Sequence, residues 1–281
     1  MKNQLKQLKQ YKPTTSGLRK MTVVDFSVLT TRKPKKKLTS GFKRAVGRDQ
    51  TGQISVRHKG GGAKRKFRQI FSLDKKIDMP AKIEQIEYDP NRSAFIVLAS
   101  FKDKTPAYLL AWDGVKVGDM VVAGERTEIQ KGNRLKLKNI PNGLSIFDVE
   151  IYPGQGGKLV RSAGAATSIV AKEGNFVHLK MPSGEIRKIN KECFASVGQV
   201  SNPTHSAQRI GKAGRMRHMG IRPTVRGKAM HPAAHPHGGG EGVNPIGLKY
   251  PKTPWGKPAR GVLTRKKNKY SARMIIQRRK K

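Results

Sequence analysis

Residues 81–121 read AKIEQIEYDPNRSAFIVLASFKDKTPAYLLAWDGVKVGDMV. Short runs rich in Ile, Val, Phe and Tyr end at the turn sequences Asp-Pro-Asn, Lys-Thr-Pro and Val-Gly-Asp. Within the runs the apolar period is close to two, which is typical of antiparallel strands bounded by turns. Because no helical pattern separates the runs, the segment predicts antiparallel sheet and argues against a βαβ arrangement.

The same pattern continues to residue 200, and we expect about ten strands between residues 81 and 200. Glu173-Gly174-Asn175 and Pro182-Ser183-Gly184 are typical hairpin turns. Small curled barrels suit such short strands, since closure removes exposed edges. A change of pattern near 126–132 predicts two barrels, over 81–130 and 131–200. Each alone would be only marginally stable, so we expect them to pack together.

Charge separates this core from its flanks. The chain has 59 Lys and Arg residues against 18 Asp and Glu, for a formal net charge of +41. Residues 1–80 hold 22 basic and 4 acidic side chains, residues 201–281 hold 20 and 1, and the middle holds 17 and 13. We therefore predict two long, basic, irregular extensions, 1–80 and 201–281, that become ordered only on a polyanion. Within the second, the pattern of 202–214 predicts one short helix.

Several functional classes are excluded at this stage. No apolar run approaches the roughly 18 residues that a membrane span needs, and the N-terminus lacks the apolar region of a secretory signal. A soluble intracellular protein is expected. The single cysteine, Cys193, rules out an internal disulfide or a cysteine metal cluster. Neither GxxxxGK[ST] nor GxGxxG occurs, so no nucleotide pocket is expected. The functional classes that remain as candidates are chromatin proteins, ribosomal proteins and polybasic membrane-binding proteins.

The loop RPTVRGKAMHPAAHPHGGGEG (222–242) is the main functional candidate. Its prolines and glycines exclude a regular helix or strand and allow the backbone to approach a ligand closely. Cationic side chains and the near absence of carboxylates suit a polyanion. The candidate RNA-binding residues in this loop are Arg222, Arg226, Lys228, His231, His235 and His237.

Further basic candidates lie in the first extension and on barrel loops. Three glycines (60–62) stand beside basic residues and allow backbone amides to reach phosphates. The block TRKPKKK (31–37) is either a solvated tail or a phosphate contact. Loop arginines suit bidentate recognition of phosphate or guanine. The candidates here are Lys64, Arg65, Lys66, Arg68, Lys76, Arg92 and Arg161.

Eight motifs in fixed order resemble the universal large-subunit ribosomal protein two family, in its bacterial or organellar form. They are YKPTTSGLR (11–19), GGGAKRKFR (60–68), EYDPNRSA (87–94), PGQGGKLVRSAG (153–164), GIRPTVRGKAM (220–230), HPHGGGEG (235–242), TPWGKP (253–258) and TRKKNK (264–269).

This resemblance implies an oligonucleotide/oligosaccharide-binding-type barrel followed by an SH3-like barrel, with both extensions threaded into large-subunit rRNA. It implies roles in subunit joining, tRNA binding and peptide-bond formation, and places Arg92 and Arg161 on the RNA-binding face. The implied partners are large-subunit rRNA, other large-subunit proteins and small-subunit rRNA across the interface, with no cofactor, metal or membrane. A cytoplasmic ribosome is expected, with an organellar one as the alternative.

The histidine loop leaves three hypotheses. The family reads MNPVDHPHGGGEG where this chain has MHPAAHPHGGGEG, so His231 and Ala234 replace an Asn and an Asp. The resemblance implicates His235 in peptidyl transfer, but the acidic neighbour that would orient its imidazole is missing. A metal site would need ligands beyond three imidazoles in a stiff loop. We therefore favour a structural role and expect no enzyme.

Two other functional classes remain as alternatives at this point. A nucleoid-type protein that coats DNA explains the charge, but it does not explain two barrels that carry loop arginines. A metal-dependent hydrolase built on the histidines is the enzyme alternative. Trp255 either stacks on a base or caps the extension against a barrel.

Overall fold

The computed structural model describes residues 8–31, 33–41, 43–125, 127–266 and 268–279. These residues form two compact units. Unit 1 takes the described residues of Met1–Arg44, Lys64–Arg215 and Arg273–Lys281, and it contains both large sheets. Unit 2 combines Ala45–Ala63 of the first extension with Met216–Ala272 of the second.

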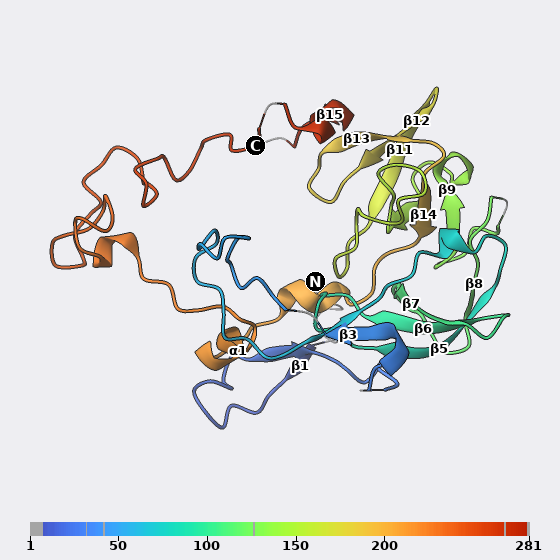
Figure 1. Ribbon diagram of the computed structural model, residues 1–281, viewed down its shortest axis with the longest axis horizontal. Coiled ribbons are helices and arrows are strands. Elements are labelled where there is room, and N and C mark those ends of the chain that lie inside the picture. The colour runs from blue at the N-terminus through green and yellow to red at the C-terminus, as the bar shows by residue number, and fades with distance from the viewer. Residues whose placement is uncertain (1–7, 32, 42, 126, 267, 280–281) are drawn as a thin grey trace. The chain divides into compact units, whose positions relative to one another are not determined.

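The first barrel is a curled four-stranded antiparallel sheet in the order β7-β6-β5-β8 (Figure 1). A bulge between Ile83 and Gln85 increases the bend of its longest strand. Apolar side chains from all four strands, among them Ile83 and Val97, meet in one fully buried cluster. The strands are β5 (Ala81–Glu87), β6 (Ile96–Phe101), β7 (Pro106–Leu110) and β8 (Met120–Val121).

The second barrel is a seven-stranded sheet in the order β15-β13-β12-β11-β10-β14-β9 (Figure 1). Leu135, Ile146, Ile169 and Leu179 are each at most 1% exposed in its core. The strands are β9 (Arg134–Lys136), β10 (Ser145–Phe147), β11 (Thr167–Glu173), β12 (Phe176–Lys180), β13 (Ile186–Asn190), β14 (Phe194–Val197) and β15 (Ile275–Gln277).

Both hairpins that the sequence predicts in this sheet are confirmed. Glu173 pairs with Phe176 across the two-residue turn between β11 and β12, where Gly174 has φ +55°. Gly184, with φ +82°, turns the chain between β12 and β13. The fold class is therefore as expected: an all-β core with an oligonucleotide-binding-type barrel followed by an SH3-like barrel.

A buried arginine joins the two barrels. Arg134 on β9 is 1% exposed, and its guanidinium donates to Asp74 Oδ1 (2.9 Å) and to the Asp148 backbone carbonyl (2.7 Å). The Glu150 carboxylate lies 3.8 Å from the same guanidinium and accepts backbone N–H groups of Gly156 and other residues. Burial pushes the pKa of Asp74 upward, but the charge of Arg134 and hydrogen bonds outweigh it, and the net pKa is lowered.

The extensions contain short elements only. Two-stranded sheets pair β1 (Leu8–Gln10) with β2 (Thr22–Val24) and β3 (Thr39–Gly41) with β4 (Lys66–Arg68). The 3-10 turns in the described residues are η2 (Lys36–Leu38), η3 (Leu73–Lys75), η4 (Leu137–Asn139), η5 (Pro203–Ala207), η6 (Gly227–Ala229) and η7 (Tyr270–Met274).

The helix predicted over 202–214 is wrong in position. Pro203 begins only the 3-10 turn η5. Gly211, which follows this turn, adopts φ +78° and so cannot continue a helix. Helix α1 (Ala213–His218) begins after this glycine. None of the helices in the described ranges is long and apolar enough to cross a membrane.

Backbone pairing joins the two extensions within unit 2. The N–H of Gly60 donates to the Gly220 carbonyl (2.9 Å), and the N–H of Arg222 donates to the His58 carbonyl (3.0 Å). Lys59 and Ile221 form an antiparallel bridge between these bonds. Two segments about 160 residues apart in the chain thus form one local structure. Main-chain hydrogen bonds hold it together, and no side-chain pattern in the sequence indicates the pairing.

Candidate nucleic-acid interface

The turn at residues 89–93 is the centre of the basic face in unit 1. Asp89 is fully buried, and its carboxylate accepts the backbone N–H of Asn91 (2.9 Å), an Asx turn that fixes the loop. The other carboxylate oxygen pairs with Arg92 Nε at 2.5 Å. The terminal nitrogens of Arg92 make no hydrogen bond within the described residues, so a fixed guanidinium edge is left for a ligand.

The basic segment that begins at Lys64 docks on this turn. Arg65 donates from Nη1 to the Pro90 carbonyl (2.7 Å), and Asn91 Nδ2 donates to the Lys66 carbonyl (2.7 Å). Lys64 and Lys66 are exposed beside it. The structure therefore brings Lys64, Arg65 and Lys66 next to Arg92, although about 25 residues separate them in sequence.

The loop that carries Arg161 docks on the same turn from the other barrel. The N–H of Ala163 donates to Ser93 Oγ (3.0 Å), and Arg161 Nε forms an ion pair with Asp148 Oδ1 at 2.9 Å. The Arg161 side chain is 31% exposed. Three segments that sequence reasoning treated separately therefore meet around residues 89–93, and carboxylates anchor both loop arginines.

Arg68 and Lys76 occupy different surroundings. Arg68 is 7% exposed and donates from Nη1 to the Lys66 carbonyl, next to the buried Glu87. Lys76 pairs with Asp103, donates to Thr105 Oγ1 (2.6 Å) and lies over the Phe101 ring. Both side chains are therefore engaged by the protein itself.

The glycine triplet and the histidine loop lie in unit 2. A Cβ placed on Gly61 would lie 3.9 Å from the Arg217 guanidinium, and one on Gly60 would lie 3.9 Å from Arg222 Cδ. The N–H groups of Gly61 and Gly62 have no hydrogen bond among the residues described. Free amides flanked by guanidinium groups are a typical phosphate-binding arrangement. Arg217 could not be identified from the sequence, because its position beside the glycines depends on the backbone pairing.

His235 is the packed centre of its loop. It is 8% exposed, and a Cβ on Gly227 would lie 2.5 Å from its ring, so only glycine fits there. Its Nδ1 accepts the backbone N–H of His237 (3.0 Å), and the two rings lie 4.8 Å apart. His237 Nε2 in turn accepts the N–H of Lys252 (2.9 Å). The imidazoles therefore act as acceptors that fold the loop.

The remaining loop candidates point outward or bind locally. Arg222 and Arg226 are exposed, and Lys228 donates to the Asn244 carbonyl (3.4 Å). His231 is exposed, and its Nδ1 accepts the N–H of Ala233 (3.2 Å). No group of three or more His, Cys, Asp or Glu side chains within the described ranges is arranged to hold a metal ion. At each of the three histidines a metal would have to displace a backbone hydrogen bond.

Sequence reasoning missed the residues that position the arginines. Asp89 stands three residues before Arg92, so the DPNR motif itself carried that signal. Asp148 stands 13 residues before Arg161, and no local pattern links the two residues. Ser93 joins the loops through its hydroxyl oxygen, and a serine in a turn gives no indication of such a role.

Comparison with protein families identifies the chain. Residues 35–123 match the family model "Ribosomal Proteins L2, RNA binding N-terminal domain", and residues 130–256 match "Ribosomal Proteins L2, C-terminal domain". The chain belongs to the ribosomal protein L2 family. As an L2 family member it is a structural, rRNA-binding component of the large ribosomal subunit, where it acts together with other ribosomal proteins. The range matched by the first L2 domain ends at residue 123 and the range matched by the second begins at residue 130, just before β9 and its buried arginine.

Proposed function

We propose that the chain is a primary rRNA-binding protein that supports subunit association, tRNA binding and peptide-bond formation mainly by organising RNA. The observation that carries this proposal is the convergence of three basic segments on the turn at 89–93. In this proposal the extensions supply most of the affinity by neutralising phosphates, and the barrel face fixes the register on folded rRNA. We further propose contact with small-subunit rRNA and residence on a cytoplasmic ribosome.

The anchored arginines favour recognition of a specific RNA shape over general coating. Arg92 and Arg161 are each held at Nε by a carboxylate, so little side-chain freedom is lost when their outer nitrogens bind phosphate or a base edge. In this scheme Lys64, Arg65 and Lys66 contact the same RNA segment. Arg68 and Lys76 contribute by holding β4 and the residues that follow it, with contact to RNA as a secondary role.

A binding assay tests this role. The full chain is titrated against a folded large-subunit rRNA fragment and against duplex DNA of equal length, at physiological salt. Arg92→Ala and Arg161→Ala are each expected to weaken rRNA binding by about 1–3 kcal/mol. Arg187→Ala, which removes one charge on β13 away from this face, is the matched control and is expected to change affinity far less. Equal affinity for duplex DNA would instead favour the nucleoid-type alternative.

For His235 we propose a structural role. Because Nδ1 accepts a backbone N–H, the ring is neutral with its proton on Nε2, and it presents a donor rather than a general base. His235→Gln is expected to give subunits that assemble imperfectly or join poorly. Normal assembly and joining combined with a lost chemical step would overturn this role in favour of catalysis. Metal analysis of the purified chain tests the hydrolase alternative.

A further inference from the structure

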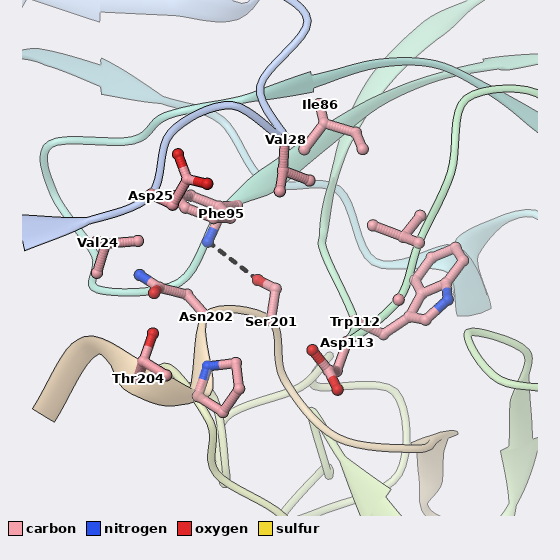
Figure 2. Close-up of a pocket in the computed structure, with 13 residues that line it drawn as sticks. Val24, Asp25, Val28, Ile86, Phe95, Trp112, Asp113, Ser201, Asn202 and Thr204 are labelled. Atoms are coloured by element: carbon pink, nitrogen blue, oxygen red, sulfur yellow. Dashed lines mark hydrogen bonds between the residues drawn. The ribbon is translucent and has the colours of Figure 1, made fainter. Parts of the chain in front are cut away.

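One pocket of unit 1 has an acidic character that contrasts with the rest of the chain. It has a volume of about 280 Å³ and lies between the loop after β2, the first barrel and the segment that leaves the second barrel (Figure 2). Two carboxylates line it, Asp25 after β2 and Asp113 after β7. None of the lining residues is Lys or Arg, although the chain has 59 of them. The lining itself therefore favours a cation over a phosphate, although Lys9, which is not part of the lining, lies close enough to Asp25 to lower its pKa.

Both carboxylates are suited to bind a cation. Hydrogen bonds from the Ser27 hydroxyl and backbone N–H lower the pKa of Asp25, which keeps this side chain ionised at neutral pH. The Asp113 side chain is exposed, and its carboxylate makes no hydrogen bond or ion pair with any described residue. The Asp25 carboxylate is thus held in place, and both oxygens of the Asp113 carboxylate are available to accept hydrogen bonds from a ligand.

Asn202 supplies an independent observation. It lines the same pocket, is 8% exposed and adopts a left-handed conformation with φ +62°. Its Nδ2 donates to the Ser93 carbonyl (2.9 Å), which fixes the amide, and its Oδ1 is buried without a hydrogen-bond partner. An unsatisfied buried acceptor and backbone strain are both features that cluster at binding sites. The hydrogen-bond partner that Asn202 Oδ1 lacks must be a donor, and a cationic side chain is a donor.

The rest of the lining suits an aliphatic stem. Val28 is 53% exposed at the pocket, and Ile86, Phe95 and Trp112 form buried apolar walls (Figure 2). A long basic side chain buries its methylene groups on such walls while its charged head meets carboxylates. Arginine fits better than lysine, because its guanidinium is weakly hydrated, packs on aromatic rings and binds carboxylates through a planar fork.

We propose that this pocket binds an arginine side chain presented by a basic segment of another large-subunit ribosomal protein. The proposal rests on the chain's membership of the large subunit, which brings basic protein segments close to it. A protein is favoured over RNA because the lining offers acceptors and negative charge and no cation for a phosphate. The site would fix a neighbouring protein beside the RNA-binding face, since Asn202 and Ser93 connect the two.

Site-specific cross-linking in purified large subunits tests the proposal. Val28→Cys carries a photoreactive group into the pocket, and Val117→Cys, which is 52% exposed outside it, is the control. We expect position 28, and not position 117, to cross-link to an arginine-containing segment of another ribosomal protein, mapped by mass spectrometry. Cross-links from position 28 only to rRNA, only to residues 1–7 of this chain, or no more than from the control would overturn the proposal.

A peptide of the mapped segment then tests the chemistry. Trp112 fluorescence in a Trp255→Phe chain reports binding, since the chain has two tryptophans. Replacing the arginine with citrulline, or introducing Asp25→Asn with Asp113→Asn, is expected to weaken binding about tenfold or more. Glu84→Gln with Glu241→Gln removes two exposed charges outside the pocket and should leave binding unchanged. Equal affinity of the arginine and citrulline peptides would refute the site.

These outcomes are separable from those of the proposed RNA-binding role. Cross-linking is scored only in subunits that already contain the chain, so RNA binding is intact there. The rRNA affinity of the Asp25→Asn, Asp113→Asn chain is measured beside that of the Glu84→Gln, Glu241→Gln control, and we expect the two to agree. A selective loss in the first would place these carboxylates in the RNA-binding face instead and overturn the separate site.

Discussion

Replacing Arg134 with methionine is expected to destabilise unit 1 strongly. Methionine is nearly as long and keeps the packing between the barrels, so the change removes mainly the charge and its hydrogen bonds. Three carboxylates would lose their shared cation: Asp74, Asp148 and Glu150. Asp148 keeps its ion pair with Arg161, whereas Asp74 and Glu150 have no other cationic partner among the described residues.

The expected loss in the free energy of unfolding follows from the burial of Arg134 and its three carboxylate partners. Arg134 is 1% exposed and the side chains of Asp74, Asp148 and Glu150 are 6%, 14% and 0% exposed, so solvent cannot replace the lost cation. Removing one partner of a buried ion pair costs about 3–5 kcal/mol. Arg187→Met on β13 is the matched control, because its pair with Glu185 is more exposed and should contribute about 1 kcal/mol or less.

The pH dependence of stability should also change sign. In the native chain the pKa of Asp74 is lowered, so its contribution to stability is complete above the unfolded value near ~3.9 and is lost as pH falls below it. Without the charge of Arg134, burial is the largest influence left on Asp74, and the pKa of this carboxyl is expected to rise. The variant should therefore gain stability as pH falls from about 7 towards about 5, whereas the native chain does not.

Urea unfolding of the Trp255→Phe chain provides the assay. Trp112 is 4% exposed and packs so closely on Gly132, two residues before Arg134, that a Cβ there would lie 2.7 Å from its ring. Its fluorescence should report separation of the barrels directly. A loss no larger than that of Arg187→Met, or a variant whose stability falls with pH as the native chain's does, would refute the reasoning.

Three further predictions concern other parts of the chain. Gly227→Ala places a Cβ 2.5 Å from the His235 ring and should speed amide exchange across residues 230–239, whereas Gly214→Ala, with open space around it, should not. Burial raises the pKa of Cys193 to about 12, so the thiol should resist alkylation at pH 8 until urea unfolds the chain; rapid native labelling would contradict this. Affinity for rRNA should fall about a thousandfold or more between about 50 and about 200 mM salt, measured by filter binding; a flat profile would exclude the extensions from binding.

The regular core could be read from sequence because its strands obey a local rule. Alternation in Ala81–Glu87 and glycine turns at positions 174 and 184 depend only on neighbouring residues, and the structure contains these elements. The short helix expected within 202–214 was misplaced, because the segment opened by Pro203 forms only a 3-10 turn and the α-helix begins at Ala213. Gly211 does end the first segment, as expected, but local pattern did not indicate that the helix would lie after this glycine.

Only part of the candidate site could be predicted from the sequence, because the partners of its arginines could not. Arg92 and Arg161 stand in turns and read as surface cations, but the carboxylates that anchor them come from buried positions. Arg134 shows the reverse case, since an arginine among alternating residues reads as exposed and is in fact buried by partners up to 60 residues away. Electrostatic partners distant in sequence leave no periodic trace.

The pairing of His58–Ala63 with His218–Arg222 also has a consequence for how the protein is made. At a synthesis rate of about 5–20 residues per second, the earlier segment is synthesised roughly 8–30 seconds before its partner. During that interval a cationic, glycine-rich segment is unpaired in a crowded cell full of nascent and messenger RNA. Unit 2 can therefore be completed only late in translation, when residues 218–222 become available to pair.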